Sequence, residues 1–359
     1  ILFKQVFMLA LGGGIMYAVS KVKFTVYSKL SQLLLGVTIV LLGITLVFGS
    51  SVNGASRWLM IPGIGLTFQT SDLARVVIVV YLARVLGKHR EEPWTFREVL
   101  LRLGLPIAAV CGLILPANFS TAALLGLTCF VVMFIAQVPI KHLASLTGIA
   151  VGAFAVLLVI GKAKPELLPR AGTWEKRAER FFAGTSQETA EDRDANYQAN
   201  QAKVAIANGG LMPNGPGSGT SRNYMPHPES DMIFAFIIEE YGSIIGGLGI
   251  MLLYLILLFR AMRIARKCEK PFGQLTAIGL ALGLVLQALV NMAVSVNLLP
   301  VTGQPLPIVS LGGTSLWFTC VALGIIISVS RSVYDTEAPE EDQQRPRTAS
   351  PDGPTVAIA

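Results

Sequence analysis

The sequence predicts an all-α fold, a polytopic transmembrane helical bundle. The chain has 359 residues, of which 53% are hydrophobic and only 14% are charged, whereas soluble domains carry about 25% charged residues. The mean hydropathy is +0.61, and the apolar residues form long blocks separated by short charged loops. Because so few charges cannot cover a water-exposed surface, the chain is expected to lie in a membrane.

Nine apolar stretches are visible in the sequence. A helix needs about 20 residues, at about 1.5 Å each, to cross the hydrocarbon core of a bilayer. The stretch at 100–115 is the weakest, because Arg102 lies near its start and Pro106 interrupts it, so we expect a tilted or kinked helix there. The nine stretches cover residues 1–20, 30–48, 66–86, 100–115, 119–138, 143–161, 232–259, 272–296 and 305–329.

The loop charges orient the bundle. Lys and Arg residues fill alternate loops, around 21–29, 84–102, 141 and 260–270, while the short loops between them carry Arg57 alone or no charge. The positive-inside rule places the basic loops in the cytoplasm. The net charge of +7 is therefore a topology signal and excludes nucleic acid as the expected partner. In this orientation the chain starts outside, at Ile1 rather than at Met, so we expect a further span ahead of it.

The chain divides into four parts. Residues 1–161 hold six spans, 162–231 form one large extracytoplasmic loop, 232–331 hold three C-terminal spans and 332–359 form a cytoplasmic tail. The tail is rich in Pro, Glu, Asp and Gln and predicts disorder. Within the outer loop, residues 174–182 predict a short helix, either amphipathic and lying in the membrane interface or simply solvated.

Cysteine and histidine usage argues against a disulfide or a structural metal. Three of the four cysteines fall in spans and the fourth in a basic cytoplasmic loop, so no disulfide is expected in the outer loop. The three histidines are scattered, and no pair of cysteines has the spacing of zinc ligands. We therefore predict no dedicated metal site.

The outer loop ends in a glycine-rich segment, residues 208–231. Its glycines allow the backbone to approach a ligand closely and to turn N–H groups toward an anion. The alternative is a flexible Gly/Pro linker, and composition alone does not separate the two. The hydrogen-bond donors available for phosphate or sugar are Ser218, Thr220, Ser221, Arg222 and His227.

Asp231 is a lone carboxylate at the mouth of the apolar span that follows. Reduced solvation there would raise the pKa of the carboxyl and make it a better proton acceptor for an alcohol. The alternative is a helix N-cap, which the residues alone favour, and the two roles are compatible.

Two further acidic residues, Glu239 and Glu240, lie inside the same span. Ionisable groups at membrane depth are costly and usually face a partner or a polar cavity. Arg57 and Arg75 are their candidate partners. For Glu240, and for Asp72 beside Arg75, a structural ion pair is the favoured interpretation.

The segment 297–315 has three prolines and three glycines at the start of an apolar stretch and includes Thr302 and Ser310. Such a composition predicts a broken or re-entrant helix, whose free backbone groups must face protein or water rather than lipid. Irregular backbone at membrane depth marks either a site or a close helix crossing.

These residues resemble a known family. Pro300, Thr302-Gly303, Pro305-Leu-Pro307 and Ser310-x-Gly312-Gly313-x-Ser315 resemble the C-terminal motif of the SEDS family, the FtsW/RodA/SpoVE proteins. The resemblance covers essentially residues 1–331 and implies ten spans with both termini in the cytoplasm, which fits nine visible spans and a first span that is missing. Further matching segments, in the family's order, are Val52–Trp58, Phe68–Arg75, Gly209–Gly210, Ser230–Ala235 and Glu239–Gly242.

Three positions depart from the family pattern. Asn118 stands where the family usually has a carboxylate, Arg75 replaces a lysine, and Leu311 replaces an aromatic residue. Arginine keeps the charge but presents it in a different geometry. With these changes the chain looks closer to FtsW of the Bacteroidetes type than to RodA.

The resemblance implies a peptidoglycan glycosyltransferase of the bacterial inner membrane that polymerises lipid II on the extracytoplasmic face, in division or elongation. Asp231 matches the family's catalytic aspartate, and this match overrides the preference for a helix cap. Glu239, Glu240, Asn118 and Asp72 are expected to be structural polar groups within the spans. The residues expected to bind pyrophosphate or sugar are Arg57, Arg75, Ser221, Arg222, His227, Thr302 and Ser310.

The resemblance also implies partners. A class B penicillin-binding protein would supply the transpeptidase activity. Other divisome or elongasome membrane proteins are expected as well, and a divalent cation, Mg²⁺ or Mn²⁺, is a candidate for assisting the leaving pyrophosphate. Two alternatives stay open at this point: a lipid II flippase or transporter, and a non-catalytic scaffold.

Overall fold

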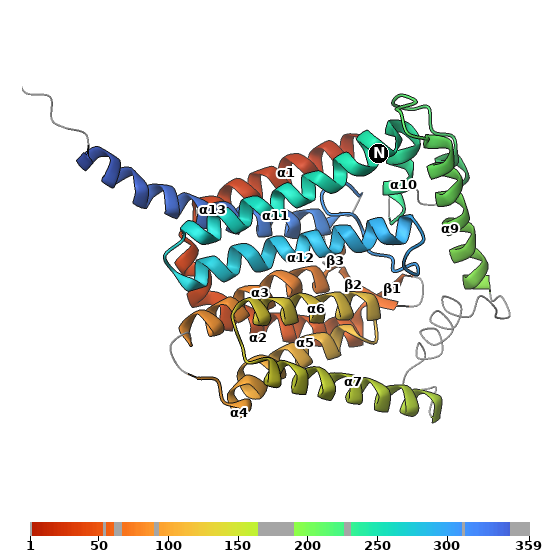
Figure 1. Ribbon diagram of the computed structural model, residues 1–359. Helices are drawn as coiled ribbons and strands as arrows, with labels where there is room; N and C mark the ends of the chain where they lie inside the picture. The colour runs from red at the N-terminus through yellow and green to blue at the C-terminus, as the bar shows by residue number, and fades with distance from the viewer. Residues whose placement is uncertain are drawn as a thin grey trace, which may run out of the picture.

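The computed structural model describes residues 2–52, 55–60, 67–89, 93–163, 190–225, 231–310 and 313–344. Its helices run side by side as a bundle (Figure 1), and a helix occupies the greater part of each of the nine predicted spans. Five helical stretches within the described residues are long and apolar enough to cross a membrane: α2, α7, the stretch Ile233–Lys267 that includes α10, η3 and α11, then α12 and α13. The predicted polytopic helical membrane fold is confirmed.

The first half of the bundle comprises helices that connect through short loops. Their bounds are α1 (Leu2–Lys21), α2 (Phe24–Phe48), α3 (Thr70–Lys88), α4 (Phe96–Glu98), η1 (Val99–Gly104), α5 (Leu105–Ile114), α6 (Phe119–Ile135) and α7 (Ile140–Ala163). The weak stretch at 100–115 is irregular as expected, because η1 is a π-helical turn that directly precedes α5, with Pro106 in the first turn of α5.

The second half contains the elements that carry most of the candidate site. Their bounds are α9 (Ala190–Gly209), η2 (Ser221–Tyr224), α10 (Ile233–Tyr241), η3 (Gly242–Leu248), α11 (Gly249–Lys267), α12 (Pro271–Ser295) and α13 (Thr314–Gln344). Helices α10, η3 and α11 follow one another without a loop, but the chain turns sharply at Gly242, which has φ +71°. The turn packs η3 back against α10, because a Cβ added at Gly246 would lie 2.7 Å from the Ile237 carbonyl.

A small antiparallel sheet lies between α2 and α3, and the all-α prediction did not include it. It consists of β1 (Ser50–Val52), β2 (Ala55–Met60) and β3 (Thr67–Gln69) in the order β1-β2-β3. The Cα of Trp58 in β2 pairs with Ser50 on one side and Gln69 on the other. Such short strands between two apolar helices carry too little alternation to be recognised in the sequence.

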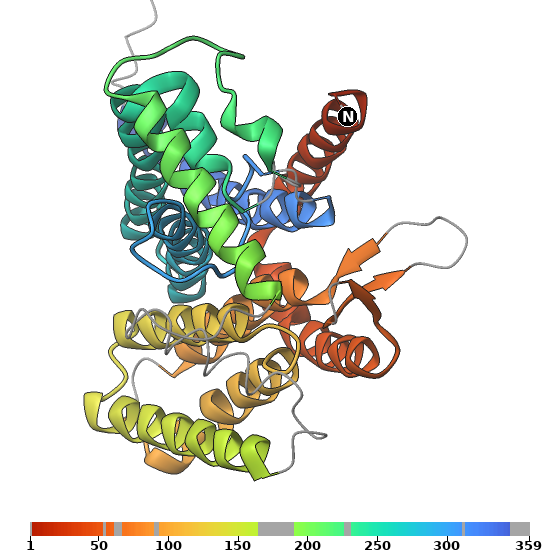
Figure 2. The ribbon, with the colours of Figure 1, turned by 90° about the vertical axis from the view of Figure 1, so that its right-hand side faces the viewer.

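The most enclosed helices are α3, α12 and the spanning part of α13. Ile78 and Leu82 of α3 are completely buried, and a Cβ added at Gly279 of α12 would lie 2.7 Å from Val79 of α3, so these two helices cross closely. By contrast, only 6% of the spanning window of α7 is buried, and α7 lies at the edge of the bundle in both views (Figures 1 and 2).

The two ends of the bundle differ in content. The sheet, α9 and the start of α10 gather at one end, and α4 and the α11–α12 connection lie at the other (Figure 1). The second end contains the Lys/Arg-rich connections. Near this end Arg84 of α3 donates from its guanidinium to the Ser28 carbonyl at 2.8 Å and so ties α3 to α2. The basic connections therefore lie at the end opposite the sheet and α9; which end faces the cytoplasm stays a prediction.

Two boundaries differ from the prediction. The last span begins at Thr314 rather than near 305, because the Pro- and Gly-rich residues before it form irregular backbone. Helix α13 continues to Gln344, so residues 332–344 of the predicted disordered tail are helical; Glu, Gln and Ala are good helix formers that extend an existing helix at little cost. The predicted helix at 174–182 lies outside the described residues.

Helix α9 in the outer loop was not predicted from the sequence. It packs against α10 through Ala202 and Ala205, which are completely buried. Because alanine contributes little to an apolar stripe, this face gave no clear periodic signal.

Candidate active site

Asp231 lies two residues before α10, at the end of the bundle that holds α9 and the small sheet, and is partly exposed. It is not the cap of that helix: the N-cap is Met232, and no side chain makes a capping hydrogen bond there. Among the described residues, nothing donates a hydrogen bond to the Asp231 carboxylate. The cap interpretation is therefore wrong, and no capping role occupies the Asp231 carboxylate.

The surroundings of Asp231 are built from the irregular segment before α13. A Cβ added at Gly303 would lie 3.7 Å from the Asp231 Oδ2, and Gly303 has φ +64°, a conformation that glycine adopts without strain. The backbone of residues 302–304 therefore faces the carboxylate.

Asn291 of α12 connects these two segments. Its Nδ2 donates to the Asp231 carbonyl at 2.7 Å and to the Gln304 carbonyl at 2.8 Å, and the side chain is 1% exposed. One buried amide thus fixes the start of α10 against the segment that faces the carboxylate.

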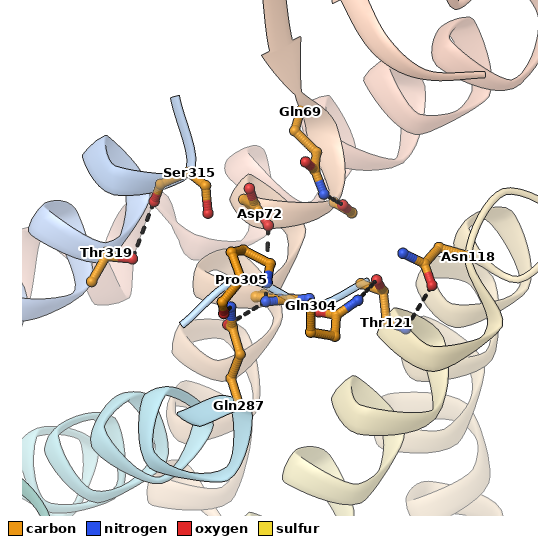
Figure 3. A network of polar contacts seen from close by, with 11 residues as sticks. Gln69, Asp72, Asn118, Thr121, Gln287, Gln304, Pro305, Ser315 and Thr319 are labelled. Atoms are coloured by element: carbon orange, nitrogen blue, oxygen red, sulfur yellow. Dashed lines mark hydrogen bonds and ion pairs between the residues drawn. The ribbon is translucent and has the colours of Figure 1, made fainter. Parts of the chain in front are cut away.

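A network of polar side chains continues from Gln304 into the bundle (Figure 3). The Arg75 guanidinium of α3 donates to the side-chain oxygens of both Gln287 and Gln304. Gln304 Nε2 in turn donates to the Thr121 hydroxyl at 2.8 Å, and Gln287 Nε2 donates to the Pro305 carbonyl at 2.8 Å. The irregular segment is therefore held by side chains from α3, α6 and α12.

Arg75 is mostly enclosed within this network. Its Nη1 lies 3.9 Å from Asp72 Oδ1, and the hydroxyl of Ser315 faces the same carboxylate (Figure 3). The predicted ion pair between Asp72 and Arg75 is present. Arg75 holds protein amides, so its observed contacts are those of a residue that positions the 303–305 segment; direct binding of pyrophosphate stays a prediction.

Asn118 is the N-cap of α6, where its side chain accepts a hydrogen bond from the Thr121 N–H at 3.2 Å. Asparagine and aspartate are about equally good N-caps. This accounts for the replacement of a carboxylate at this position without loss of the local structure.

The glycine-rich segment encloses Glu239. The Oε1 of Glu239 accepts hydrogen bonds from the backbone N–H groups of Thr220 at 3.3 Å and Ser221 at 3.2 Å, and from the Ser221 hydroxyl at 2.7 Å. The Ser221 donors predicted for substrate are therefore occupied by a carboxylate of the chain itself.

Glu240 pairs with a residue that was not among its predicted partners. Arg222 Nη1 lies 3.1 Å from Glu240 Oε1, and Arg75 contacts neither glutamate, so the predicted pairing of Arg75 with them is wrong. The physical reason is the path of the outer loop, which returns along α10 and brings Arg222 to the end of that helix. The Arg222 side chain is 47% exposed and so remains accessible to solvent.

The other predicted site residues are placed as follows. The Ser310 hydroxyl accepts the Leu306 N–H at 2.8 Å and closes a buried turn, while Thr302 is half-buried next to Gly303. Arg57 lies in β2 with its side chain outside the described part, and His227 and Leu311 lie outside the described residues.

The sequence did not single out Asn291, Gln287, Gln304 or Thr121, which connect the site. A usable signal was present for two of them, because Gln287 and Asn291 are amides within the predicted span 272–296. Polar side chains at such depth usually have a partner in the protein.

A small recess opens beside this network. Its lining combines aliphatic side chains with hydroxyl and amide groups. The lining residues are Leu42, Thr45, Leu46, Gln69, Thr70, Ser71, Leu113, Ile114, Ala117 and Asn118.

Known proteins share both the sequence pattern and the fold. Residues 1–335 match the model of the FtsW/RodA/SpoVE family of cell cycle proteins. The chain is 29% identical over 337 residues to a probable peptidoglycan glycosyltransferase FtsW of Coxiella burnetii, covering 92% of this chain and 85% of that one.

Two solved structures have similar folds. A chain of a peptidoglycan synthase complex, whose structure concerns the coordination of polymerization and crosslinking, superposes with TM-score 0.70 and 28% identity, covering 93% of this chain and 90% of that one. The rod shape determining protein RodA of Thermus thermophilus superposes with TM-score 0.66 and 26% identity, covering 93% of this chain and 88% of that one.

Proposed function

Because the chain belongs to the FtsW/RodA/SpoVE family of cell cycle proteins, as its sequence resemblance predicted, we propose that it is a peptidoglycan glycosyltransferase that polymerises lipid II into β-1,4-linked glycan. The observation that carries this proposal is Asp231: a partly exposed carboxylate at the outer end, without a capping role, whose backbone is fixed by Asn291. The likeness to FtsW of the Bacteroidetes type stays a prediction.

The reaction requires one base. The 4-hydroxyl of the acceptor sugar attacks the anomeric carbon of the donor, and Asp231 accepts the hydroxyl proton as the new C–O bond forms. The bond from the anomeric carbon to the pyrophosphate oxygen breaks with its electron pair, which releases undecaprenyl pyrophosphate and inverts the anomeric centre. A second carboxylate is not needed, because no hydrolytic water is activated and the leaving group departs without a strong acid.

The leaving pyrophosphate needs positive charge. Arg222 is the candidate that the structure leaves exposed at the outer end, and Arg57 is the second. Within the described residues no three or more His, Cys, Asp or Glu side chains gather as a metal site. A bound Mg²⁺ or Mn²⁺ would neutralise phosphate charge, and Asp231 together with the substrate's own phosphate oxygens would have to hold it.

The lipid part of the substrate needs an apolar surface that borders the polar site. The recess lined by Leu42, Leu46, Leu113 and Ile114, with Gln69 among the polar groups that border them, offers such a combination. We propose that the isoprenoid chain lies between spans on this side.

Location and partners complete the proposal. Because the basic loops lie at the end opposite Asp231, we place the protein in the bacterial cytoplasmic (inner) membrane with Asp231 on the extracytoplasmic face. A class B penicillin-binding protein is the proposed partner, supported by the likeness to a chain of a peptidoglycan synthase complex. Other divisome or elongasome proteins stay predictions.

The test uses purified full-length protein with lipid II and a class B penicillin-binding protein, and follows glycan strands on gels. Asp231→Asn keeps the size of the side chain and removes the base, so we expect polymerisation to fall by at least about 100-fold, within the range that general acid–base catalysis contributes. Glu98→Gln, the same kind of change in α4 at the opposite end of the bundle, is the matched control. Normal polymerisation by Asp231→Asn would refute the assignment, and lipid transfer across vesicles without any polymer would favour the flippase.

A further inference from the structure

The turn formed by Gly219–Arg222 is shaped as a site for an anion. Three donors, the N–H groups of Thr220 and Ser221 and the Ser221 hydroxyl, converge on one oxygen of Glu239 at 3.3, 3.2 and 2.7 Å. Asn208 Nδ2 approaches the same oxygen at 3.5 Å. Glu239 is only 3% exposed, so a carboxylate of the chain itself fills this turn and excludes water from it.

Two glycines allow the outer loop to come this close to α10. A Cβ added at Gly219 would lie 2.9 Å from Glu239 Oε2, and one added at Gly209 would lie 2.2 Å from the Ile238 carbonyl. Neither position has room for a side chain. Asn214 adds a further tie, because its Nδ2 donates to the Glu239 carbonyl at 3.1 Å.

The position of Glu239 relative to Asp231 links the contact between Glu239 and the turn to the candidate base. Glu239 follows Asp231 by eight residues, which is about 12 Å along a helix, while Ser221 precedes Asp231 by ten. The chain therefore leaves the far end of α10 at Ser221 and returns to its start at Asp231. The hydrogen bonds to Glu239 fix the chain at Ser221, and the hydrogen bond from Asn291 fixes it at Asp231.

We infer that Glu239 is a positioning residue for Asp231: its carboxylate fills the anion-binding turn at Gly219–Arg222, fixes the segment that leads to Asp231, and denies that turn to the pyrophosphate of the substrate. This inference rests on the proposed function, because it assigns Glu239 a part in the same reaction. It also changes the role expected for Ser221, from substrate contact to internal anchor.

Three variants test the inference in the full chain with its transpeptidase partner. Glu239→Ala removes the anion, and we expect kcat to fall about 100-fold with KM within about twofold, the size expected for a misplaced base. Glu239→Gln keeps an oxygen that accepts from the same donors, and we expect it to retain kcat within about tenfold of wild type. Glu98→Gln, which changes a carboxylate of α4 at the opposite end of the bundle, is the control and should stay within about twofold.

Gly219→Ala is a second variant that is expected to displace the Glu239 carboxylate from the turn. It leaves Glu239 in place but pushes its carboxylate away, so the fall in kcat should resemble that of Glu239→Ala. This variant keeps the inference testable where Glu239→Ala yields too little folded protein.

Hydrogen exchange of residues 215–225, measured without substrate, reports on the turn independently of activity. We expect faster exchange in Glu239→Ala and Gly219→Ala and unchanged exchange in Glu98→Gln. If the wild type makes no glycan but the variants show the expected exchange rates, the proposed function is refuted, while the contact between Glu239 and the turn still stands. A wild type that polymerises, with Glu239→Ala equally active or with KM raised and kcat unchanged, would overturn the inference.

Discussion

Asn291→Leu tests the connection between Asp231 and the segment that faces it. Leucine matches asparagine in size but donates no hydrogen bond, so the carbonyls of Asp231 and Gln304 lose their partners at 2.7 and 2.8 Å. The bond to Gln304 is buried, and leaving a buried acceptor unsatisfied costs about 1–3 kcal/mol. The bond to Asp231 is partly buried and contributes about 1 kcal/mol. We expect a loss of roughly 2–4 kcal/mol in the free energy of unfolding.

The effect on activity should exceed the effect on folding at working temperature. Once the Asp231 carbonyl is free, the carboxylate is no longer held opposite Gly303, and a displacement of about 1 Å costs up to about 100-fold in rate. The assay is the initial rate of glycan synthesis, with thermal unfolding in detergent measured in parallel. Ser295→Ala is the control, because the Ser295 hydroxyl bonds only the Asn291 carbonyl of its own helix at 3.0 Å. Asn291→Leu protein that is destabilised yet polymerises within about twofold of wild type would refute the reasoning.

Three further outcomes follow from local structure. Asn118→Asp should keep the cap of α6 and leave the unfolding temperature unchanged, whereas Asn118→Ala should cost about 1 kcal/mol. Gly242→Ala should cost more than about 2 kcal/mol in chemical unfolding, because Gly242 has φ +71° and an added Cβ would lie 2.6 Å from the Leu211 carbonyl. The hydrogen bond from the Thr95 hydroxyl, more than any other contact, lowers the pKa of Glu98 from 4.5. The stabilisation from Glu98 is therefore present above pH 4.5 and lost as the pH falls through the lowered pKa; in an NMR titration, Thr95→Ala should raise the midpoint of Glu98.

Much of the fold could be predicted because a membrane imposes simple rules. Length and hydropathy place the spans, and the alternate basic loops give their direction. What could not be predicted depends on contacts between distant segments. The sheet at 50–69 and helix α9 bury small or short surfaces that have no periodic signal of their own, and the helical continuation of α13 past 331 depends on extension from a stable span.

The candidate site also has a part that could be predicted from the sequence and a part that could not. Asp231 and the irregular segment 297–315 stand out in the sequence, because a lone carboxylate and three prolines are rare at the edge of a span. The partner of Glu240 could not be deduced, since the sequence does not show that the outer loop returns along α10 and brings Arg222 beside it. The same return path converts Ser221 from an expected substrate donor into a partner of Glu239.

Arg75 stands where the resemblance leads one to expect lysine, and the network explains why the two residues are not equivalent here. Two different nitrogens of its planar guanidinium reach Gln287 and Gln304. A lysine ammonium is a single point and cannot keep both in the same geometry. Arg75→Lys should therefore free one of these two amides, lower the free energy of unfolding by about 1–3 kcal/mol and slow polymerisation.

Arg84→Lys is the matched control in the same helix. One nitrogen of Arg84, Nη1, makes the bonds to Ser28 and Lys29, at 2.8 and 3.2 Å, so a single ammonium can replace it with little loss. Unfolding in detergent compares the two variants directly. Equal stability losses in Arg75→Lys and Arg84→Lys would mean that the guanidinium fork does not hold the 303–305 segment, and the position of the backbone opposite Asp231 would then need another cause.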